Sequence, residues 1–298
     1  MKNRWMFSVI VLWAIALIIS KQLSEWETAI LFQPTPLMPE HYKGKEEWNT
    51  WEVEYIDYSK HPLISPNFFW NTDARSLKVK KSIGYVRRSK ANLTTGILCF
   101  TGNSGNGAIW TTKVFGPMFE NMQNHLYVYE YPSFGNRKNE TMNADTIHMN
   151  FLRELHAAMQ DQRALYNIQQ WIVIGNSMGT GFACDLAENY VENVSALILL
   201  VPYASIQVAI NHFTKGSLGF MTSYKWLDNV KNLKWLNLLV DSYAFFAEYD
   251  EILPIETHLT PLIPVLKEYE IVKRHHNDVM FDTNVIRKIR QIVTTYSL

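Results

Sequence analysis

The chain has 298 residues and a mass of 34.7 kDa, which is enough for one large α/β domain. Its 28 basic residues balance its 28 acidic residues, so the net charge is zero and the composition offers no broad basic surface. We therefore expect no nucleic acid among its partners. Cys99 and Cys184 are too few for a disulfide framework, and we expect both to be buried thiols.

An apolar run near the N-terminus is the first element in chain order. About 16 residues without a charge lie between Arg4 and Lys21, and as a helix they span roughly 24 Å of a hydrocarbon core about 30 Å thick. We expect an uncleaved transmembrane helix over residues 1–22, with a cleaved signal peptide and a secreted protein as the alternative. Basic residues precede the run and acidic residues follow it, which places the N-terminus in the cytosol and the domain on the periplasmic, lumenal or extracellular side.

A proline-containing tether is predicted next, over residues 23–47. Three prolines within residues 33–40 prevent a continuous helix and stiffen the segment. The folded domain is then expected over residues 48–298. Because the tether separates the apolar run from this domain, the sequence predicts that removing residues 1–32 leaves a soluble, active protein.

Strands and helices alternate along the rest of the chain. Apolar alternation or continuous apolar runs predict strands at residues 51–58, 79–88, 96–100, 125–131, 171–174, 196–201, 243–249 and 268–274. Apolar side chains at Ile147, Phe151, Leu155 and Met159 mark one helix, and a second helix closes the chain. This order predicts an α/β fold with a mostly parallel sheet and helices on both faces. The long connection over residues 203–240 predicts a small cap insertion.

A Gly-x-Ser-x-Gly pattern joins the strand at 171–174 to the helix that follows it, and this arrangement is typical of a nucleophile elbow. Ser177 is the candidate nucleophile. Gly175 and Gly179 have no Cβ, so they allow the close approach of neighbouring chain that so sharp a turn requires. A serine hydroxyl is a weak nucleophile, and it needs an imidazole to take its proton and a carboxylate to orient the imidazole.

Both partners are present at strand ends downstream. Asp250 follows the strand at 243–249, and His276 follows the last strand. Each candidate therefore lies at the carboxyl end of a parallel strand, where such sheets bind their ligands. Alternatives remain open at this stage: His275 competes as the base, and Asp241 and Asp278 compete as the acid.

In their chain order, Ser177, Asp250 and His276 resemble the triad of α/β-hydrolases. Three segments support a narrower likeness to α/β-hydrolase-domain proteins, a group that includes membrane-anchored serine hydrolases and protein depalmitoylases. FTGNSGNG, EYPSFGNR and DEILP are similar to the group's oxyanion loop, its Asp-Tyr-x-Gly-Tyr-Gly turn and its acid loop. The likeness covers residues 95–296.

The resemblance implies a site and an activity. The backbone N–H groups of Asn103 and Met178 would form the oxyanion hole, although Thr101 stands where the family has His and Ser133 where it has Gly. The implied activity is serine hydrolysis of an acyl ester or thioester, through an acyl-enzyme. An acyltransferase that uses the same acyl-enzyme and a non-catalytic binding protein on the same scaffold are the alternatives.

Neither a metal nor a cofactor is expected, since the sequence has no HExxH or CxxC pattern. We expect His148, His156 and His258 to be ordinary helix or surface residues. The predicted cap is rich in large apolar side chains, which either line an acyl pocket or pack the cap onto the core. They are Phe213, Phe220, Trp226, Trp235 and Leu236.

Overall fold

The computed structural model describes residues 22, 25, 26, 28, 29, 31–34, 48–56, 78–142, 144–216 and 219–297. Residues 1–21 of the predicted transmembrane helix and most of the predicted tether lie outside this set. Within the set, no helix combines the length and the apolar character that crossing a bilayer requires.

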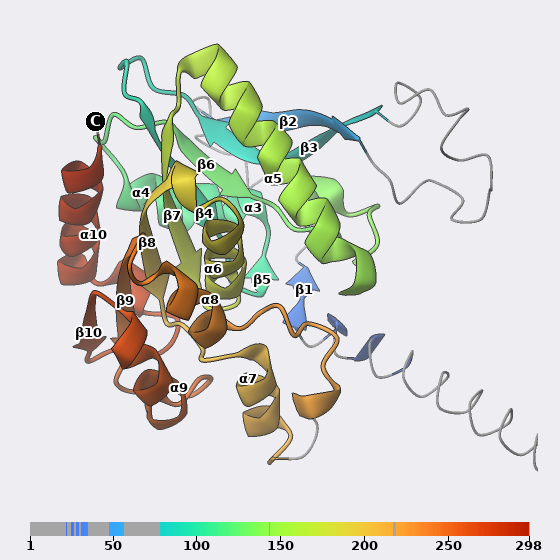
Figure 1. Ribbon diagram of the computed structural model, residues 1–298, viewed down its shortest axis with the longest axis vertical. Coiled ribbons are helices and arrows are strands. Elements are labelled where there is room, and N and C mark those ends of the chain that lie inside the picture. The colour runs from blue at the N-terminus through green and yellow to red at the C-terminus, as the bar shows by residue number, and fades with distance from the viewer. Residues whose placement is uncertain are drawn as a thin grey trace, which may run out of the picture.

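One mixed sheet organises the domain (Figure 1). Its strands are β2 (Trp48–Ile56), β3 (Lys78–Arg87), β4 (Thr95–Phe100), β6 (Leu126–Tyr129), β7 (Gln170–Asn176), β8 (Val194–Leu200), β9 (Asp241–Ala247) and β10 (Glu268–Val272). They lie in the order β10-β9-β8-β7-β4-β6-β3-β2. The pairs from β10 to β6 are parallel, whereas β3 is antiparallel to both β6 and β2. The mostly parallel α/β fold predicted from the sequence is confirmed, and the predicted strands differ from the observed ones only at their ends.

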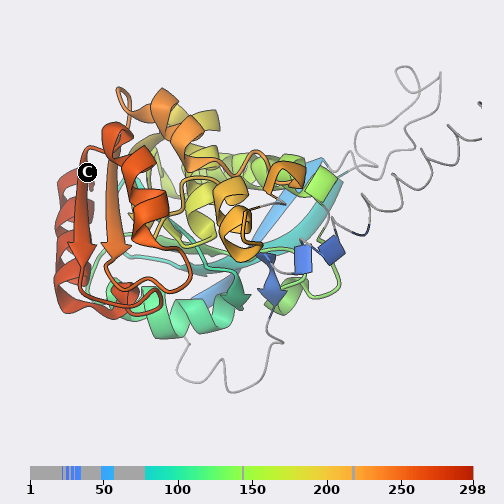
Figure 2. The same ribbon diagram turned by 90° about the horizontal axis from the view of Figure 1, so that it is seen from below.

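Helices cover both faces of the sheet (Figure 2). One face carries α5 (Ala144–Tyr166), α6 (Gly179–Asn189) and α8 (Asn229–Leu236), and the other carries α10 (Thr283–Tyr296) and a helical segment made of α3 (Gly107–Trp110), η4 (Thr111–Phe115) and α4 (Gly116–Met118). Shorter elements complete the described chain: α7 (Ile206–Phe213), α9 (Ile255–Leu262), η5 (Gly135–Arg137), η6 (Val191–Asn193), η7 (Gly219–Met221), η8 (Ile263–Val265) and η9 (Val279–Phe281). A separate pair of short parallel strands joins β1 (Gln33–Pro34) to β5 (Ser104–Gly105).

Two hydrophobic cores follow from the two-residue period of the strands. Along β4, Leu98 and Phe100 belong to the core beneath α5 and α6, whereas Ile97 and Cys99 belong to the core beneath α10. Cys99 and Cys184 are both free thiols and fully buried, as the sequence predicts. A sheet buried on both faces is a rigid support for residues at the carboxyl ends of its strands.

The connection between β8 and β9 differs from the predicted cap insertion at 203–240. Leu233 and Leu236 of α8 are buried in the same core as α6, so α8 is part of the helical layer on the sheet. The reason is the spacing of these two side chains, three residues apart on one helical face, which directs both toward the core. Only α7, η7 and the loops beside them remain as candidate cap.

The tether prediction also needs correction, at its N-terminal half. Leu31 and Phe32 are buried in the main core, with 6% and 4% of their surface exposed. The ring of Phe32 contacts the rings of Tyr131, Phe182 and Tyr224, with centroids 6.0, 6.3 and 5.6 Å apart. The expectation that residues 1–32 can be removed without loss to the core is therefore wrong, because the deletion would empty a buried aromatic site.

Candidate active site

Ser177 lies at the sharp turn between β7 and α6. Its φ angle is +50°, in the left-handed region that few residues other than glycine adopt. The flanking glycines explain how the turn fits: a Cβ on Gly175 would lie 2.6 Å from the carbonyl oxygen of Gly179, and a Cβ on Gly179 would lie 2.5 Å from the carbonyl oxygens of Phe100 and Thr101. Both distances are far inside van der Waals contact. The turn therefore needs glycine at both positions and holds Ser177 in one strained conformation.

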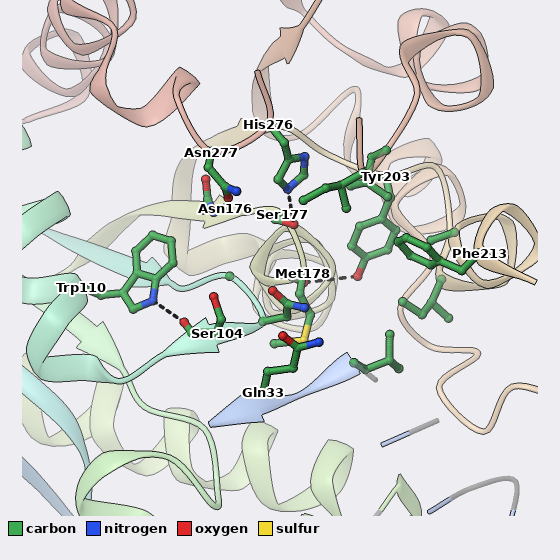
Figure 3. Close-up of a pocket in the computed structure, with 17 residues that line it drawn as sticks. Gln33, Ser104, Trp110, Asn176, Ser177, Met178, Tyr203, Phe213, His276 and Asn277 are labelled. Atoms are coloured by element: carbon green, nitrogen blue, oxygen red, sulfur yellow. Dashed lines mark hydrogen bonds between the residues drawn. The ribbon is translucent and has the colours of Figure 1, made fainter. Parts of the chain in front are cut away.

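His276 lies in the loop after β10, and its side chain points at the turn (Figure 3). Its Nε2 atom is 2.9 Å from the Oγ atom of Ser177. The imidazole is almost fully buried, with 3% of the side chain exposed. Its other nitrogen, Nδ1, is 2.8 Å from Oδ2 of Asp250 and 2.9 Å from Oδ1.

The carboxylate of Asp250 determines which nitrogen of His276 carries the proton. An ionised carboxylate only accepts hydrogen bonds, so Nδ1 of His276 donates its proton and Nε2 is left free to accept the hydroxyl proton of Ser177. Asp250 is itself held from a second direction, because its Oδ1 atom accepts the N–H groups of Ile252 and Leu253 at 3.0 and 2.6 Å. The three side chains thus form a continuous chain of hydrogen bonds.

The competing residues lie elsewhere. His275 points outward, with 63% of its side chain exposed, and Nδ1 of this histidine is 3.3 Å from Glu251. Asp241 begins β9 at the amino edge of the sheet and pairs there with Lys267. Asp278 is exposed in the turn after His276. The structure brings none of these three side chains into the hydrogen-bonded chain.

The predicted oxyanion residues, Asn103 and Met178, both line the cavity above Ser177. Met178 immediately precedes α6, so its N–H belongs to the positive end of that helix. In the described part of the chain, neither the N–H of Asn103 nor that of Met178 donates to a backbone carbonyl. Both N–H groups are thus available to a negatively charged oxygen.

Hydrogen bonds from outside hold the loop that contains Asn103. The hydroxyl of Tyr131 donates to the Thr101 carbonyl at 2.8 Å, and the indole N–H of Trp110 donates to the Ser104 carbonyl at 2.8 Å. Gly105 has a φ angle of +89°, which lets the chain turn tightly here. With its carbonyls fixed on the outside, the loop is stiff although Thr101 replaces the histidine of the family pattern.

A buried glutamate supports the same loop from below. The Glu130 carboxylate accepts the N–H of Gly107 at 2.8 Å through one oxygen and the N–H of Asn136 at 3.0 Å through the other. Burial raises the pKa of Glu130 to about 7. Glu130, in the EYPSFGNR segment, therefore links the end of the oxyanion loop to the turn at η5 through hydrogen bonds. Arg137, in that turn, is buried and donates to the Glu154 carboxylate of α5 at 2.8 Å.

A cavity of about 500 Å³ opens above the hydrogen-bonded chain. Its walls combine the proposed catalytic groups with apolar side chains from the N-terminal segment, α7 and the loop after β9. The lining residues are Leu31, Gln33, Gly102, Asn103, Ser104, Trp110, Asn176, Ser177, Met178, Tyr203, Ile206, Ala209, Phe213, Ile252, Leu253, His276 and Asn277.

The aromatic residues of the predicted cap have separate fates. Phe213 lines the cavity, whereas Phe220 and Trp235 are exposed, at 66% and 73%. Trp226 packs against the ring of Phe182 with centroids 5.0 Å apart, so it belongs to the core. Only Phe213 therefore matches the expectation of an aromatic acyl pocket.

The three scattered histidines also differ from one another. The Nε2 atom of His148 is 2.9 Å from Asp185, and the ring stacks on Trp226. His156 is exposed on α5, as expected. His258 is not a surface residue: it is 1% exposed, and its Nδ1 atom accepts the N–H of Ala204 at 3.1 Å. Among the described residues, no three His, Cys, Asp or Glu side chains are grouped closely enough to hold a metal ion.

Several residues of the site escape a local sequence pattern. Leu31 and Gln33 reach the cavity from a segment about 70 residues before the oxyanion loop, and the hydroxyl of Tyr203 donates to the Met178 carbonyl at 3.3 Å. The position of Tyr203 just after β8 was the one available signal, because it also lies at a carboxyl end of the sheet. Leu31 and Gln33 carry no comparable signal.

Comparisons with known proteins agree with this architecture. A profile of the alpha/beta hydrolase fold family matches residues 96–249, slightly more than half of the 298-residue chain. Among curated proteins, no sequence matches at a significant level.

Solved structures share the fold at low sequence identity. An esterase from Pyrococcus furiosus is 13% identical with a TM-score of 0.59, over 89% of this chain and 97% of the esterase. An alpha-beta hydrolase from Vibrio vulnificus is 18% identical with a TM-score of 0.54, over 71% of this chain and 75% of that protein. The esterase domain of a Rhodothermus marinus protein is 10% identical with a TM-score of 0.51, over 84% and 97%.

The buried His258 predicts a loss of stability in mild acid. Burial lowers the pKa of His258 to about 4, from a usual value near 6.5, because the protonated ring would carry a charge in a site shielded from water. Between these two values the unfolded chain binds a proton that the folded chain does not, so the free energy of unfolding falls as the pH decreases from 6.5 to 4, by up to about 3 kcal/mol. In His258→Asn, whose oxygen can still accept the Ala204 N–H, urea unfolding should depend less on pH over this range. Identical pH slopes in both proteins would contradict the assignment.

Proposed function

Because this chain belongs to the alpha/beta hydrolase fold family, we propose that it is a serine hydrolase that cleaves an acyl ester or thioester through an acyl-enzyme on Ser177. The observation that carries the proposal is the hydrogen-bonded chain from Ser177 through His276 to Asp250, with distances of 2.9 and 2.8 Å. It ends at the floor of a cavity large enough for an acyl group.

The proposed reaction follows from the atoms at the site. Oγ of Ser177 attacks the carbonyl carbon of the substrate while its proton moves to Nε2 of His276. Asp250 stabilises the imidazolium that forms, and the N–H groups of Asn103 and Met178 stabilise the tetrahedral oxyanion. When the intermediate collapses, His276 returns the proton to the leaving alcohol or thiol. Water then attacks the carbonyl carbon of the acyl-enzyme while His276 takes its proton. When the second tetrahedral intermediate collapses, His276 returns the proton to Oγ of Ser177, and the carboxylic acid is released.

Kinetics of side-chain variants test these roles. In Asp250→Asn the imidazole is held in the wrong tautomer, so kcat for an activated ester should fall by about 10⁴. His276→Ala should lose several orders of magnitude as well. Asp241→Asn and Asp278→Asn are the matched controls, and both should keep wild-type turnover. Near-wild-type activity of Asp250→Asn, together with loss in either control, would reassign the acid.

The cavity favours acyl chains over small acyl groups as substrates. Ile206, Ala209 and Phe213 of α7 line one wall, and Leu31 lies in the N-terminal segment. Each methylene buried against such a wall adds about 0.8 kcal/mol of binding free energy. We therefore place the substrate among medium-chain or long-chain acyl esters and thioesters.

A series of p-nitrophenyl esters tests this substrate class. From acetate to octanoate, kcat/KM should rise several-fold with each added pair of methylenes, since the chain extends along α7. Phe213→Ala should reduce activity toward octanoate several-fold while activity toward acetate stays unchanged. Phe220→Ala is the matched control, because Phe220 is also exposed, at 66% against 50% for Phe213, but does not line the cavity. Equal effects of both variants, or a preference for acetate, would make this a small-ester hydrolase.

The apolar run supports a membrane-tethered enzyme, similar to the membrane-anchored α/β-hydrolase-domain hydrolases that the sequence resembles. In this proposal residues 1–22 span the bilayer with the N-terminus in the cytosol, and the domain lies across the membrane, close to lipid-borne acyl esters. If residues 1–22 span the bilayer, the intact chain should stay in the membrane fraction during carbonate extraction. A mature N-terminus near Leu17 would instead establish a cleaved signal peptide and a secreted protein.

A further inference from the structure

Two described side chains near the N-terminus, those of Thr28 and Phe32, hold residues 31–34 against the domain. Phe32 is buried among three aromatic rings, and the Oγ1 atom of Thr28 is 2.8 Å from the hydroxyl of Tyr224. Burial of a phenylalanine ring among other rings strongly favours one position of that side chain. The segment is therefore held in a defined place relative to the active site.

This defined place is against the outer side of the oxyanion loop. Gln33 lies opposite Ser104 in the parallel pairing of β1 with β5. The backbone N–H of Gln33 donates to the carbonyl oxygen of Asn103 at 2.7 Å. Asn103 is the residue whose own N–H is proposed as an oxyanion donor, so the bond acts on the residue that has to be aligned.

The same segment reaches the cavity. Figure 3 shows Gln33 on the strand β1 beside Met178, the residue proposed to supply the second oxyanion donor. Leu31 lines the cavity with it. The N-terminal segment thus binds the oxyanion loop at Asn103 and lines the same cavity as Met178.

The carbonyl of Asn103 completes a pattern along the loop. The carbonyls of Thr101 and Ser104 are bound by Tyr131 and Trp110, which both lie later in the chain than the loop. The carbonyl of Asn103 is bound only by Gln33 among the described residues. Without that bond, the Asn103–Ser104 peptide loses a restraint, so the backbone at Asn103 is held less firmly. The adjoining Gly102–Asn103 peptide, which carries the N–H of Asn103, is then less precisely aligned.

We infer that the main chain of Gln33 is a positioning element of the oxyanion loop, so that the short strand β1, within the predicted tether, completes the active site. The inference rests on the proposed serine hydrolase function. Gln33 acts through Asn103 and does not touch the reacting atoms. Loss of one aligned oxyanion donor costs about 10² to 10³ in kcat, and loss of a bond that aligns it should cost part of that factor.

Two substitutions at Gln33 separate its main chain from its side chain. Gln33→Pro removes the N–H, and it suits the site because Pro34 already restricts residue 33 to extended conformations. Gln33→Ala keeps the N–H and removes the side chain. In full-length protein, kcat for a p-nitrophenyl ester should be at least 10-fold lower in Gln33→Pro than in Gln33→Ala, with KM values that differ by less than about 3-fold.

An inhibitor gives a readout that a purely structural role would not move. An alkyl trifluoromethyl ketone adds to Ser177 as a tetrahedral oxyanion, so its inhibition constant should be at least 10-fold higher in Gln33→Pro than in Gln33→Ala. Equal kcat values and inhibition constants in the two variants would overturn the inference and leave the proposed function intact. Absence of esterase activity in folded wild-type protein would instead contradict the proposed function itself.

Hydrogen exchange of the wild-type protein keeps the inference testable if Gln33→Pro does not fold. The Gln33 amide should exchange slowly, and it should gain protection together with the amides of residues 102–105 when the trifluoromethyl ketone is bound. Exchange of the Gln33 amide at the rate of an unstructured chain, with or without the ketone, would overturn the inference.

Discussion

The close crossing of the Ser177 turn over the end of β4 is the constraint on which the rest of the site depends. A methyl group at Gly179 would collide with the carbonyls of Phe100 and Thr101, so only glycine lets the start of α6 lie against the first residues of the oxyanion loop. This contact brings the N–H of Met178 and the loop that contains Asn103 close to Ser177. Its cost is the strained φ angle of Ser177, which the buried sheet on either side sustains.

The base and the acid depend on the same sheet. Asp250 follows β9 and His276 follows β10, and these strands are adjacent and parallel, so their carboxyl ends bring the two side chains together. Burial strengthens the pair, because a hydrogen bond in a low dielectric is stronger than in water and an unpaired charge there is costly. The N–H groups of Ile252 and Leu253 offset part of that cost at the carboxylate. The proposed orientation of the imidazole is thus built into the fold before any substrate binds.

Local patterns were enough to predict most of the sheet and the position of the three central side chains. Ser177 directly follows β7, and Asp250 and His276 come three and four residues after β9 and β10. A parallel sheet brings the carboxyl ends of its strands to one edge. The choice between His275 and His276 needed the structure, since adjacent residues point in opposite directions from one loop.

Contacts between distant segments were beyond sequence reasoning. Leu233 and Leu236 place a predicted cap helix in the core, and Phe32 anchors part of the predicted tether in the same core. Its neighbours Leu31 and Gln33 line the cavity. In both cases the sequence has apolar residues in a polar or proline-containing stretch. The neighbouring residues do not indicate which surface of the domain these side chains will pack against. His258 is similar, because a lone histidine on a helix gives no sign that the loop after β8 covers it.

Covalent labelling tests the central claim most directly. A fluorophosphonate reacts with a serine only where a base activates the hydroxyl and an oxyanion hole receives the phosphonyl oxygen. Intact-protein mass spectrometry of the wild-type chain should show a single adduct, which peptide mapping places on Ser177. The adduct should be absent from folded Ser177→Ala and should form orders of magnitude more slowly in His276→Ala. An adduct that persists in Ser177→Ala, or folded wild-type protein that remains unlabelled, would contradict the account.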